Sequence, residues 1–267
     1  MSALAGVLGY PVAHSRSPAM MGAAFRELGL DWRYLRLPVP PELFEETVRG
    51  LPGSGYRGAN VTIPHKLAAL RLADRATAVA HAVGAANTLT FEDGAIEADN
   101  TDAGGFLAAL GDPPAGVRAL VLGAGGAARA VVWALREAGA AEVSVWNRTP
   151  ERADELAAEL EARAVHSPEP AELVVNATSV GLDPGDGAEA LPLAGLPAPG
   201  VAVELVYRGD GSETPFGGWA RSSGARVVDG VEVLVRQGAL SFTRWTGLEP
   251  PLEAMRAAAR GEISHQA

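Results

Sequence analysis

The sequence predicts an α/β protein with two domains, an N-terminal α/β domain and a Rossmann-type, doubly wound domain. The first hundred residues alternate short apolar, strand-like runs with helical patterns. A glycine-rich turn, GAGGAA at 123–128, follows an apolar run and opens a helix within a second such series. The chain has 267 residues, of which 48% are hydrophobic, so it can bury the cores of two small domains.

The first domain begins with a predicted strand at 4–10 and a predicted helix at 18–29. Ser17 precedes Pro18 and is the expected N-cap, because serine accepts from free backbone N–H groups and proline suits the first helical position. The next expected elements are a strand at 32–39, a short helix from Pro40 to about Arg49, a strand at 57–63 and a helix from Pro64. This alternation is typical of a parallel sheet.

A β-hairpin is expected at 87–99. Two alternating runs flank Asp93-Gly94 there, and this dipeptide favours the tight turns that join antiparallel strands.

The second series begins near Asp102. Its expected elements are a helix at 102–110, a strand ending at Leu122, a long helix after the glycine turn, a strand at 141–148, a helix at 150–162, strands at 172–178 and 201–207, and helices at 230–246 and 251–260. Residues 183–200, rich in glycine, proline and alanine, are expected to form a surface loop. The last helices can pack back on the first domain, so we expect domains at 1–101 with 236–267, and at 102–235.

Composition excludes several classes of function. The net charge of −10 disfavours nucleic acid as a partner, since phosphate binding favours a basic surface. The absence of cysteine excludes disulfides and thiolate chemistry. We expect no membrane span, no secretory signal and no metal site, because no apolar run is long enough and the five histidines show no metal-binding spacing. A cytoplasmic protein is the simplest expectation, and a homodimer is compatible with the sequence.

The glycine turn predicts a dinucleotide site. Gly123 permits a tight turn, Gly125 lets the backbone approach a pyrophosphate, and Ala128 occupies the third position of the G-x-G-x-x-G/A pattern. The N-terminus of the following helix offers free N–H groups to an anion.

The end of the next predicted strand favours NADP over NAD. NAD enzymes usually place a carboxylate there to bind the ribose 2′-hydroxyl. Here the strand leads into Asn147, Arg148 and Thr149, with Arg152 beyond. Guanidinium groups suit a 2′-phosphate, because they form bidentate, charge-assisted contacts with it.

The stretch GANVTIPHK contains Lys66, the only lysine of the chain. Arginine replaces lysine at every other basic position, which suggests that this position needs a group able to give up a proton. Asp102, in the segment ADNTD, is a candidate partner, although it could also serve as a helix cap beside Thr101.

Further polar residues follow the predicted strands of the first domain. Ser15, Ser17, Thr62 and Lys66 all come just after strand ends, and ligands of open α/β sheets bind beyond the carboxyl ends of the strands. Such a rim of hydroxyls with one cation suits a polyhydroxylated carboxylate.

Taken together, these motifs resemble those of the shikimate dehydrogenase family. The matching segments, in the order of the family and across nearly the whole chain, are HSRSP (14–18), GANVTIPHK (58–66), GAANT (84–88), DNTD (99–102), GAGGAAR (123–129), NRTPER (147–152), NAT (176–178) and DGVEVLVRQGALSFTRWTG (229–247). The resemblance implies reversible, NADPH-dependent reduction of 3-dehydroshikimate to shikimate, in aromatic amino-acid biosynthesis. It also implies that the first domain with the C-terminal helices binds the substrate and that the Rossmann-type domain binds NADP(H).

The resemblance also implies roles for individual residues. Lys66 and Asp102 would be the catalytic pair. The implied substrate contacts, besides this pair, are Ser15, Ser17, Thr62, Asn87, Tyr207 and Gln237. The implied cofactor contacts are Gly123, Ala124, Gly125, Gly126 and Ala127 at the phosphates, Asn147, Arg148, Thr149 and Arg152 at the 2′-phosphate, and Leu205 and Gly230 near the nicotinamide.

The chain departs from the family pattern after its Tyr207. The loop to Pro215 is longer than usual and lacks a proline before Thr214, and Glu204 stands where aspartate is more usual. The alternatives are a quinate or quinate/shikimate dehydrogenase that uses NAD, a non-catalytic module that senses NADP or shikimate, and an unrelated nucleotide-binding structural protein. The arginines at 148 and 152 disfavour an enzyme that uses NAD. The presence of Lys66 and Asp102 disfavours a non-catalytic module, and an unrelated structural protein would leave the polar residues after the strands unexplained.

Overall fold

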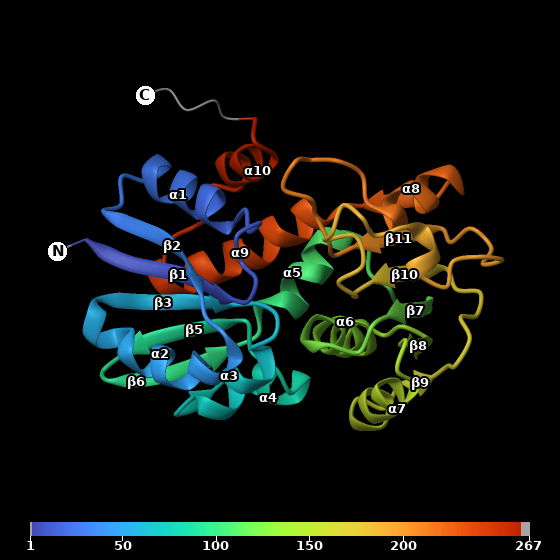
Figure 1. Cartoon of the computed structure of the whole chain (residues 1–267), viewed down its shortest axis with the longest axis horizontal. Helices are drawn as coiled ribbons and strands as arrows, with labels where there is room; N and C mark the ends of the chain where they lie inside the picture. The colour runs from blue at the N-terminus through green and yellow to red at the C-terminus, as the bar shows by residue number, and fades with distance from the viewer. Residues whose placement is uncertain (1, 263–267) are drawn as a thin grey trace. The chain divides into compact units, whose positions relative to one another are not determined.

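The computed structural model describes residues 2–262 and divides the chain into two compact units (Figure 1). One unit runs to Gly105 and resumes at Leu234, and the other comprises Phe106–Val233. Both contain a six-stranded sheet with helices, which confirms the α/β class. No helix of the described residues is long and apolar enough to cross a membrane.

The first unit is built from both ends of the chain. Its elements are β1 (Ala3–Gly9), α1 (Ser17–Glu27), β2 (Trp32–Pro38), α2 (Phe44–Gly50), β3 (Tyr56–Val61), α3 (Lys66–Leu72), β4 (Arg75–Ala76), α4 (Ala78–Val83), β5 (Thr88–Glu92), β6 (Ala95–Asp99) and α10 (Leu252–Arg260), with short 3₁₀ turns at Pro41–Leu43 and Pro52–Ser54. Two further helices, α5 (Thr101–Leu110) and α9 (Gly230–Thr246), each carry residues of both units.

The sheet of the first unit is mixed. Its order is β2-β1-β3-β5-β6-β4, with β1 parallel to β2 and β3, and β5 antiparallel to β3 and β6. The predicted hairpin is confirmed, since Glu92 pairs with Ala95 around Asp93 and Gly94, which have φ of 52° and 76°. The parallel arrangement expected for the first three strands is also confirmed, and the hairpin adds antiparallel strands to them, because a two-residue turn joins antiparallel strands.

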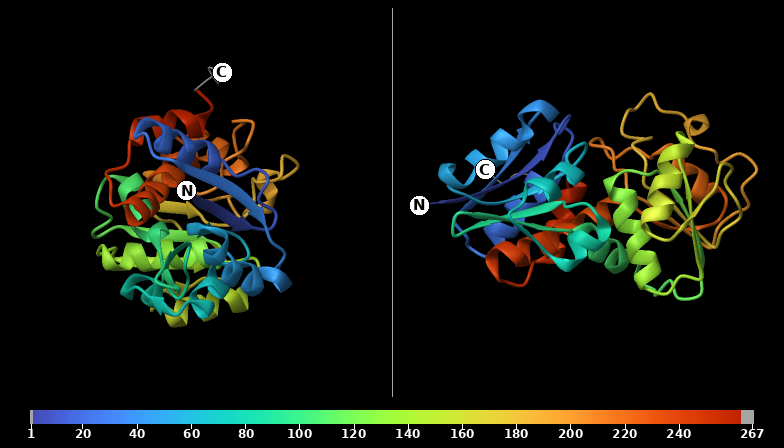
Figure 2. Two further views of the ribbon diagram at one scale, coloured as in Figure 1. Left: turned by 90° about the vertical axis from the view of Figure 1, so that its left-hand side faces the viewer. Right: turned by 90° about the horizontal axis from the view of Figure 1, so that it is seen from below.

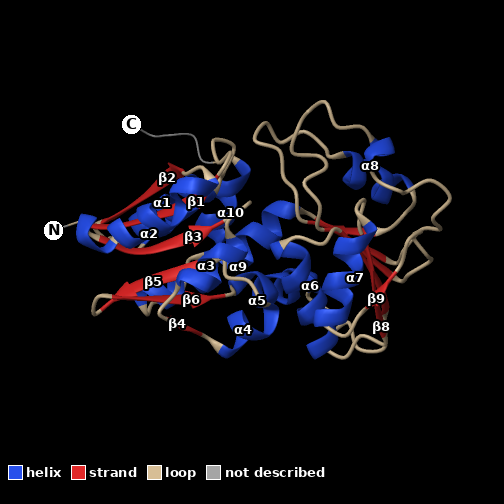
Figure 3. Cartoon of the chain, turned by 60° about the horizontal axis from the view of Figure 1, so that its bottom comes forward, coloured by secondary structure: helices blue, strands red, loops and turns tan. Residues whose placement is uncertain are grey.

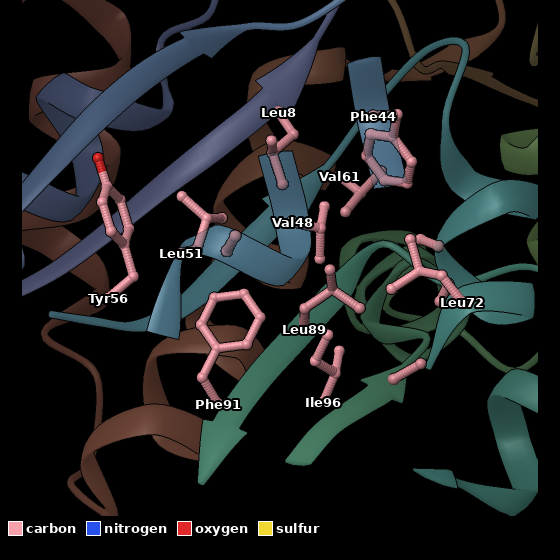
Figure 4. Packing of buried hydrophobic residues seen from close by; sticks show 14 of the residues in the cluster. Leu8, Phe44, Val48, Leu51, Tyr56, Val61, Leu72, Leu89, Phe91 and Ile96 are labelled. Atoms are coloured by element: carbon pink, nitrogen blue, oxygen red, sulfur yellow. The ribbon is translucent and has the colours of Figure 1, made fainter. Parts of the chain in front are cut away.

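One face of this sheet is covered by α2 and α3 through an apolar core (Figure 4). Ala59 and Val61 of β3, Leu89 of β5 and Ile96 of β6 all belong to this core, which Phe44 joins from α2. Because successive side chains of a strand alternate between faces, the residues between these belong to the opposite face.

The opposite face is covered by α1 and α9. The ring of Phe25 in α1 lies 5.3 Å from that of Trp32 and 5.6 Å from that of Phe242 in α9. Trp245 of α9 donates from Nε1 to the carbonyl of Leu89, and a side chain at Gly58 would collide with its indole. Figure 2 shows α9 beside the N-terminal strands in both views. The residues of β3, β5 and β6 that point away from the apolar core therefore face this helix.

Three local predictions in the first unit are wrong or incomplete. Ser17 is the first residue of α1, and the cap position is taken by Arg16 without a side-chain hydrogen bond. The helix expected from Pro64 begins at Lys66, since the chain turns first and the N–H of His65 donates to the carbonyl of Thr62. The short helix α4 was not predicted, although Thr77 caps it by accepting from the N–H of Ala80.

The second unit has a wholly parallel sheet, seen in red with its helices in blue in Figure 3. Its elements are β7 (Arg118–Leu122), α6 (Gly126–Glu137), β8 (Glu142–Trp146), α7 (Pro150–Glu159), β9 (Arg163–Ala164), β10 (Leu173–Asn176), a 3₁₀ turn at Ala188–Ala190, β11 (Val201–Glu204), α8 (Pro215–Ser222) and β12 (Arg226–Val228). The predicted strands and long helices are present, whereas β9, α8 and β12 were not predicted.

The strand order β12-β11-β10-β7-β8-β9 is the doubly wound order of a Rossmann-type sheet. The order reverses between β7 and β10, so the chain leaves these two neighbouring strands toward opposite sides. Ligands of such sheets bind in the crevice beyond the carboxyl ends of these strands. Gly123 follows β7 at this point, and Ala177 follows β10.

Candidate functional site

The side chains of Lys66 and Asp102 form an ion pair in the first unit. Lys66 Nζ lies 2.6 Å from Asp102 Oδ2, and the two side chains are 12% and 18% exposed. A pair so far removed from water is screened little and is held at a fixed distance. The structure therefore brings together the two residues implied to be catalytic.

The position of Lys66 is fixed by the residues around it. It is the first residue of α3, and its carbonyl accepts from the N–H of Ala86 at 2.9 Å. The preceding His65 is buried, stacks on Phe44 and lies with Nε2 2.7 Å from the carbonyl of Val39. Burial lowers the pKa of His65, so the ring stays neutral and its Nε2–H donates to that carbonyl.

Asp102 is held from its other side by Asn87. Asn87 Nδ2 donates to Asp102 Oδ1 at 2.8 Å and to Gln237 Oε1 at 3.1 Å. Gln237 in turn donates to the carbonyl of Leu234. Lys66 and Asn87 thus contact the two oxygens of the Asp102 carboxylate, and Gln237 of α9 contacts the amide of Asn87.

The predicted serines and threonine lie beyond the ends of β1 and β3. Ser15 and Ser17 are nearly buried, and Ser15 Oγ accepts from the N–H of Ser17 at 3.3 Å. Thr62 follows β3 and packs so tightly on the end of β1 that a side chain at Gly9 would meet its methyl group at 2.4 Å. Arg36, which the sequence did not single out, donates from Nε and Nη2 to the carbonyl of Ser15.

The glycine turn of the second unit fits the phosphates of a dinucleotide. Gly123 has φ of 116°, and a side chain there would meet the carbonyl oxygen of Ala177 at 2.8 Å. Gly125 is the N-cap of α6 without a side-chain hydrogen bond, and a side chain there would meet only open space. The first N–H groups of α6, which Gly126 and Ala127 open, are therefore free for an anion. Ala124 completes this turn.

The arginines after β8 fit a further phosphate. Arg148, Thr149 and Arg152 are exposed, and Asn147 Nδ2 donates to the carbonyl of Thr149 at 2.9 Å. Within residues 2–262, the guanidinium groups of Arg148 and Arg152 make no ion pair or hydrogen bond. Arg118, Arg136 and Arg163 of the same unit all pair with glutamates. Two free cations beyond the strand next to the glycine turn match the charge of a 2′-phosphate.

Leu205 and Gly230, implied to lie near the nicotinamide, are brought together. A side chain at Gly230 would meet the carbonyl oxygen of Val206 at 2.3 Å and the carbonyl carbon of Leu205 at 3.1 Å. The N–H of Leu205 donates to the carbonyl of Asn176 at the end of β10. Tyr207 follows and is partly buried.

Glu204, at the end of β11, connects the segments around Leu205. Glu204 Oε1 accepts from Asn176 Nδ2 and from the N–H of Val206, both at 2.9 Å, and Oε2 accepts from Thr214 Oγ1 at 2.7 Å. Burial raises the pKa of this carboxyl to about 7, although these hydrogen bonds act in the opposite direction. The glutamate found in place of the more usual aspartate thus joins three segments of the second unit.

The sequence analysis assigned no role in the site to a set of buried polar residues next to Asn87. They belong to β2, β3, β5, α5 and α9, and they are Tyr34, Asn60, Thr88, Thr101 and Ser241. These residues could have been found from the periodicity of the sequence, which shows the face of a strand or helix on which each residue lies. Asn60 and Thr88 stand next to apolar residues of their strands and so face away from the apolar core, and Ser241 follows Gln237 by one helical turn.

No group of three histidine, aspartate or glutamate side chains among the described residues could hold a metal ion.

Three protein-family models match the chain. They are the shikimate dehydrogenase substrate binding domain at residues 7–89, shikimate / quinate 5-dehydrogenase at 110–179 and the shikimate 5′-dehydrogenase C-terminal domain at 230–260.

The chain is also similar to characterised proteins over nearly its full length. It is 44% identical to the NADP⁺ shikimate dehydrogenase of Methanopyrus kandleri over 95% of this chain and 93% of that protein. The crystal structure of shikimate 5-dehydrogenase from Thermus thermophilus in complex with NADP(H) and shikimate has a TM-score of 0.85 at 45% identity, covering 98% of this chain and 100% of the other. Shikimate dehydrogenase from Aquifex aeolicus has a TM-score of 0.89 at 37% identity, covering 97% and 98%.

The raised pKa of Glu204 predicts a pH dependence of stability. The folded protein keeps this proton up to about pH 7, whereas the unfolded chain releases it near pH 4.5. The resulting stabilisation is complete below about pH 4.5 and is lost as the pH rises through about 7. We therefore expect the free energy of unfolding to fall by at most about 3 kcal/mol from this group. Urea unfolding of the parent and of Glu204→Gln from pH 5 to 8 measures it. A stability difference between the two that stays constant with pH would contradict the prediction.

Proposed function

Because the chain belongs to the shikimate dehydrogenase family, we propose that it catalyses the reversible, NADPH-dependent reduction of 3-dehydroshikimate to shikimate. The observation that supports this most directly is the ion pair between the only lysine of the chain and Asp102, at 2.6 Å. We place this reaction in aromatic amino-acid biosynthesis in the cytoplasm. The acidic net charge of −10 agrees with a small-molecule enzyme that has no nucleic-acid partner.

We propose that the two units divide the binding of the reactants. The first unit, with Ser15, Ser17 and Thr62 beyond its strand ends, would bind the hydroxylated carboxylate. Its serine hydroxyls and backbone N–H groups suit the carboxylate, since such donors bind oxygen anions. The second unit, with Gly123–Ala127 and the arginines after β8, would bind NADP(H).

NADPH, when bound, supplies the hydride that reduces the ketone carbon. Lys66 Nζ stabilises the negative charge that develops on the ketone oxygen and donates the proton, and in the reverse direction it takes up the hydroxyl proton. Asp102 orients the lysine through the 2.6 Å contact, and Asn87 fixes Asp102 at 2.8 Å. Gln237, which accepts from the same amide, is positioned to contact the substrate hydroxyls.

In the second unit, Leu205, Tyr207 and Gly230 would complete the sites. Leu205 and Gly230 would contact the nicotinamide, and their mutual contact supports a shared role. Tyr207 would contact the substrate. The loop after it is anchored by Arg208, which donates to the carbonyls of Gly181, Asp183 and Glu213.

A quinate dehydrogenase that uses NAD is the main alternative, and one matching family model covers both shikimate and quinate enzymes. The free guanidinium groups of Arg148 and Arg152 favour NADP. Lys66 and Asp102 make a non-catalytic sensing module the weaker candidate.

The function is tested by following NADPH or NADH formation with shikimate and with quinate. We expect strong activity with shikimate and NADP⁺, the pair named for the relatives, and weak activity with NAD⁺, because Arg148 and Arg152 would contact the 2′-phosphate that NAD⁺ lacks. Strong activity with quinate and NAD⁺ would replace this function by the alternative. A folded protein that binds NADPH but turns over neither substrate would favour the sensing module.

Replacement of Lys66 tests its catalytic role. We expect Lys66→Ala to lower kcat about 10²–10⁴-fold, with a smaller effect on KM for shikimate, because proton transfer would be lost while most binding contacts remain. Arg71→Ala, which removes an exposed charge from the same helix, is the matched control and should leave kcat unchanged. A kcat of Lys66→Ala within about threefold of the parent would refute the assignment.

Replacement of Arg148 tests the choice of cofactor. We expect Arg148→Ala to raise KM for NADP⁺ about tenfold or more, since a charge-assisted hydrogen bond is lost, and to leave KM for NAD⁺ nearly unchanged. Arg163→Ala removes the same charge from the neighbouring strand β9, where the guanidinium pairs with Glu142 and Glu169, and serves as the control. If Arg148→Ala weakened both cofactors equally, the contact with the 2′-phosphate would be ruled out.

A further inference from the structure

A continuous path of buried hydrogen bonds runs from β2 to the catalytic pair. It begins at Tyr34, which is 7% exposed and whose hydroxyl donates to Asn60 Oδ1 at 2.7 Å. A phenol can donate or accept, so the direction of the Asn60 amide is set by the backbone carbonyl of Asn87, which accepts from Asn60 Nδ2 at 3.2 Å. The amide nitrogen of Asn60 must then face the interior.

The nitrogen of Asn60 meets a cluster of three hydroxyls. It donates to Ser241 Oγ at 2.9 Å and to Thr88 Oγ1 at 3.2 Å. The hydroxyls of Thr88 and Ser241 lie 2.9 Å apart, and the hydroxyl of Thr101 lies 3.1 Å from each. Ser241 Oγ also lies 3.2 Å from the carbonyl oxygen of Gln237, one turn back along α9, and its single proton serves either this carbonyl or one threonine hydroxyl. Thr88 and Ser241 are completely buried, so neither side chain can touch a substrate.

The cluster ends on the amide oxygen of Asn87. Asn87 Oδ1 accepts from the N–H of Thr101 at 2.7 Å and from the hydroxyl of Thr88 at 3.2 Å. The hydroxyl of Thr101 lies 3.2 Å from this oxygen and accepts from Asn87 Nδ2 at 2.9 Å. With its oxygen held on this side, the amide nitrogen of Asn87 is turned toward Asp102 Oδ1. A flipped Asn87 would set two oxygens against each other, and Asp102 Oδ1 would lose this donor.

We propose that Tyr34 and Ser241 are positioning residues, which fix the amide of Asn87 and thereby hold the catalytic carboxylate. They act through Asn60 and the two threonines and do not touch the reactants. Ser241 is central, because its hydroxyl contacts Asn60 and both threonine hydroxyls from the C-terminal helix α9. This proposal rests on the proposed catalytic role of Lys66 and Asp102.

The expected effect is moderate, because Asn87 Oδ1 also accepts from a backbone N–H. Removing one hydroxyl loosens this amide without releasing it. We expect Tyr34→Phe and Ser241→Ala each to lower kcat about three- to tenfold, the cost of one buried hydrogen bond, with KM for NADP⁺ within about twofold of the parent. In the double variant, the fold-decrease in kcat should be smaller than the product of the two single decreases, because both residues act along one path.

Matched controls separate positioning from general loss of packing. Tyr56→Phe removes the hydroxyl of another buried tyrosine, one that has no hydrogen-bond partner among the described residues (Figure 4). Ser144→Ala removes a buried hydroxyl from the sheet of the second unit. Both controls should keep the kcat of the parent.

A second readout does not depend on turnover. Lys66 is the only lysine, so reductive methylation followed by peptide mass spectrometry reports on this one side-chain amine. When Asp102 is held less firmly, Lys66 Nζ spends less time in the 2.6 Å contact with the carboxylate and is more open to the reagent. We therefore expect faster methylation of Lys66 in Tyr34→Phe and Ser241→Ala, but not in the controls, with Asp102→Asn giving the largest increase.

The outcomes distinguish the two proposals. If the parent turns over no substrate, the proposed function fails, while the methylation rates still test the positioning of Asp102. If the parent is active and both variants match it in kcat and methylation, the positioning role is refuted. A loss of kcat that Tyr56→Phe and Ser144→Ala share, or an equal rise in KM for NADP⁺, would indicate a general structural defect and would also refute it.

Discussion

The ion pair between Lys66 and Asp102 is the constraint around which the first unit is organised. Two charges that are mostly withdrawn from water lose hydration, and they are tolerated only where further hydrogen bonds compensate them. Asn87 supplies one of these bonds to the carboxylate, and the backbone N–H of Thr101 donates to the oxygen of the same amide. The polar interior of this unit is thus a consequence of holding one charged pair at 2.6 Å.

The two faces of the sheet in the first unit differ in character: one packs into an apolar core, and the other carries polar residues next to the candidate site. The face toward α2 and α3 is apolar and closely packed, as in any α/β core. The other face carries Asn60, Thr88 and Asp99, and it meets a stripe of α9 that contains Gln237, Ser241 and Arg244. The spacing of these three residues, about one helical turn each, lets a single helix satisfy polar groups of several strands.

In the second unit, the candidate phosphate site next to β7 is formed mainly by backbone groups. The close approach of Gly123 to Ala177, where the strand order reverses, and the uncapped start of α6 provide N–H groups for phosphates. Glu204 plays a different part there, since its carboxylate joins the ends of β10 and β11 to Thr214, the N-cap of α8. Its extra length compared with aspartate lets a single side chain span these segments.

The sequence by itself determined the α/β class, the hairpin at Asp93-Gly94, the glycine turn and the family, because each depends on local spacing or on short motifs. It also singled out Lys66 and Asp102, through the bias against lysine and through the resemblance. Only the tertiary structure decided the mixed sheet, the start of α3 at Lys66 and the two-residue strands, which are set by long-range pairing. The hydroxyl cluster of Thr88, Thr101 and Ser241 was also decided only by the tertiary structure. Its members are up to 153 residues apart in the chain, and a serine or threonine acquires its role only when packing removes water and leaves other polar groups as its sole partners.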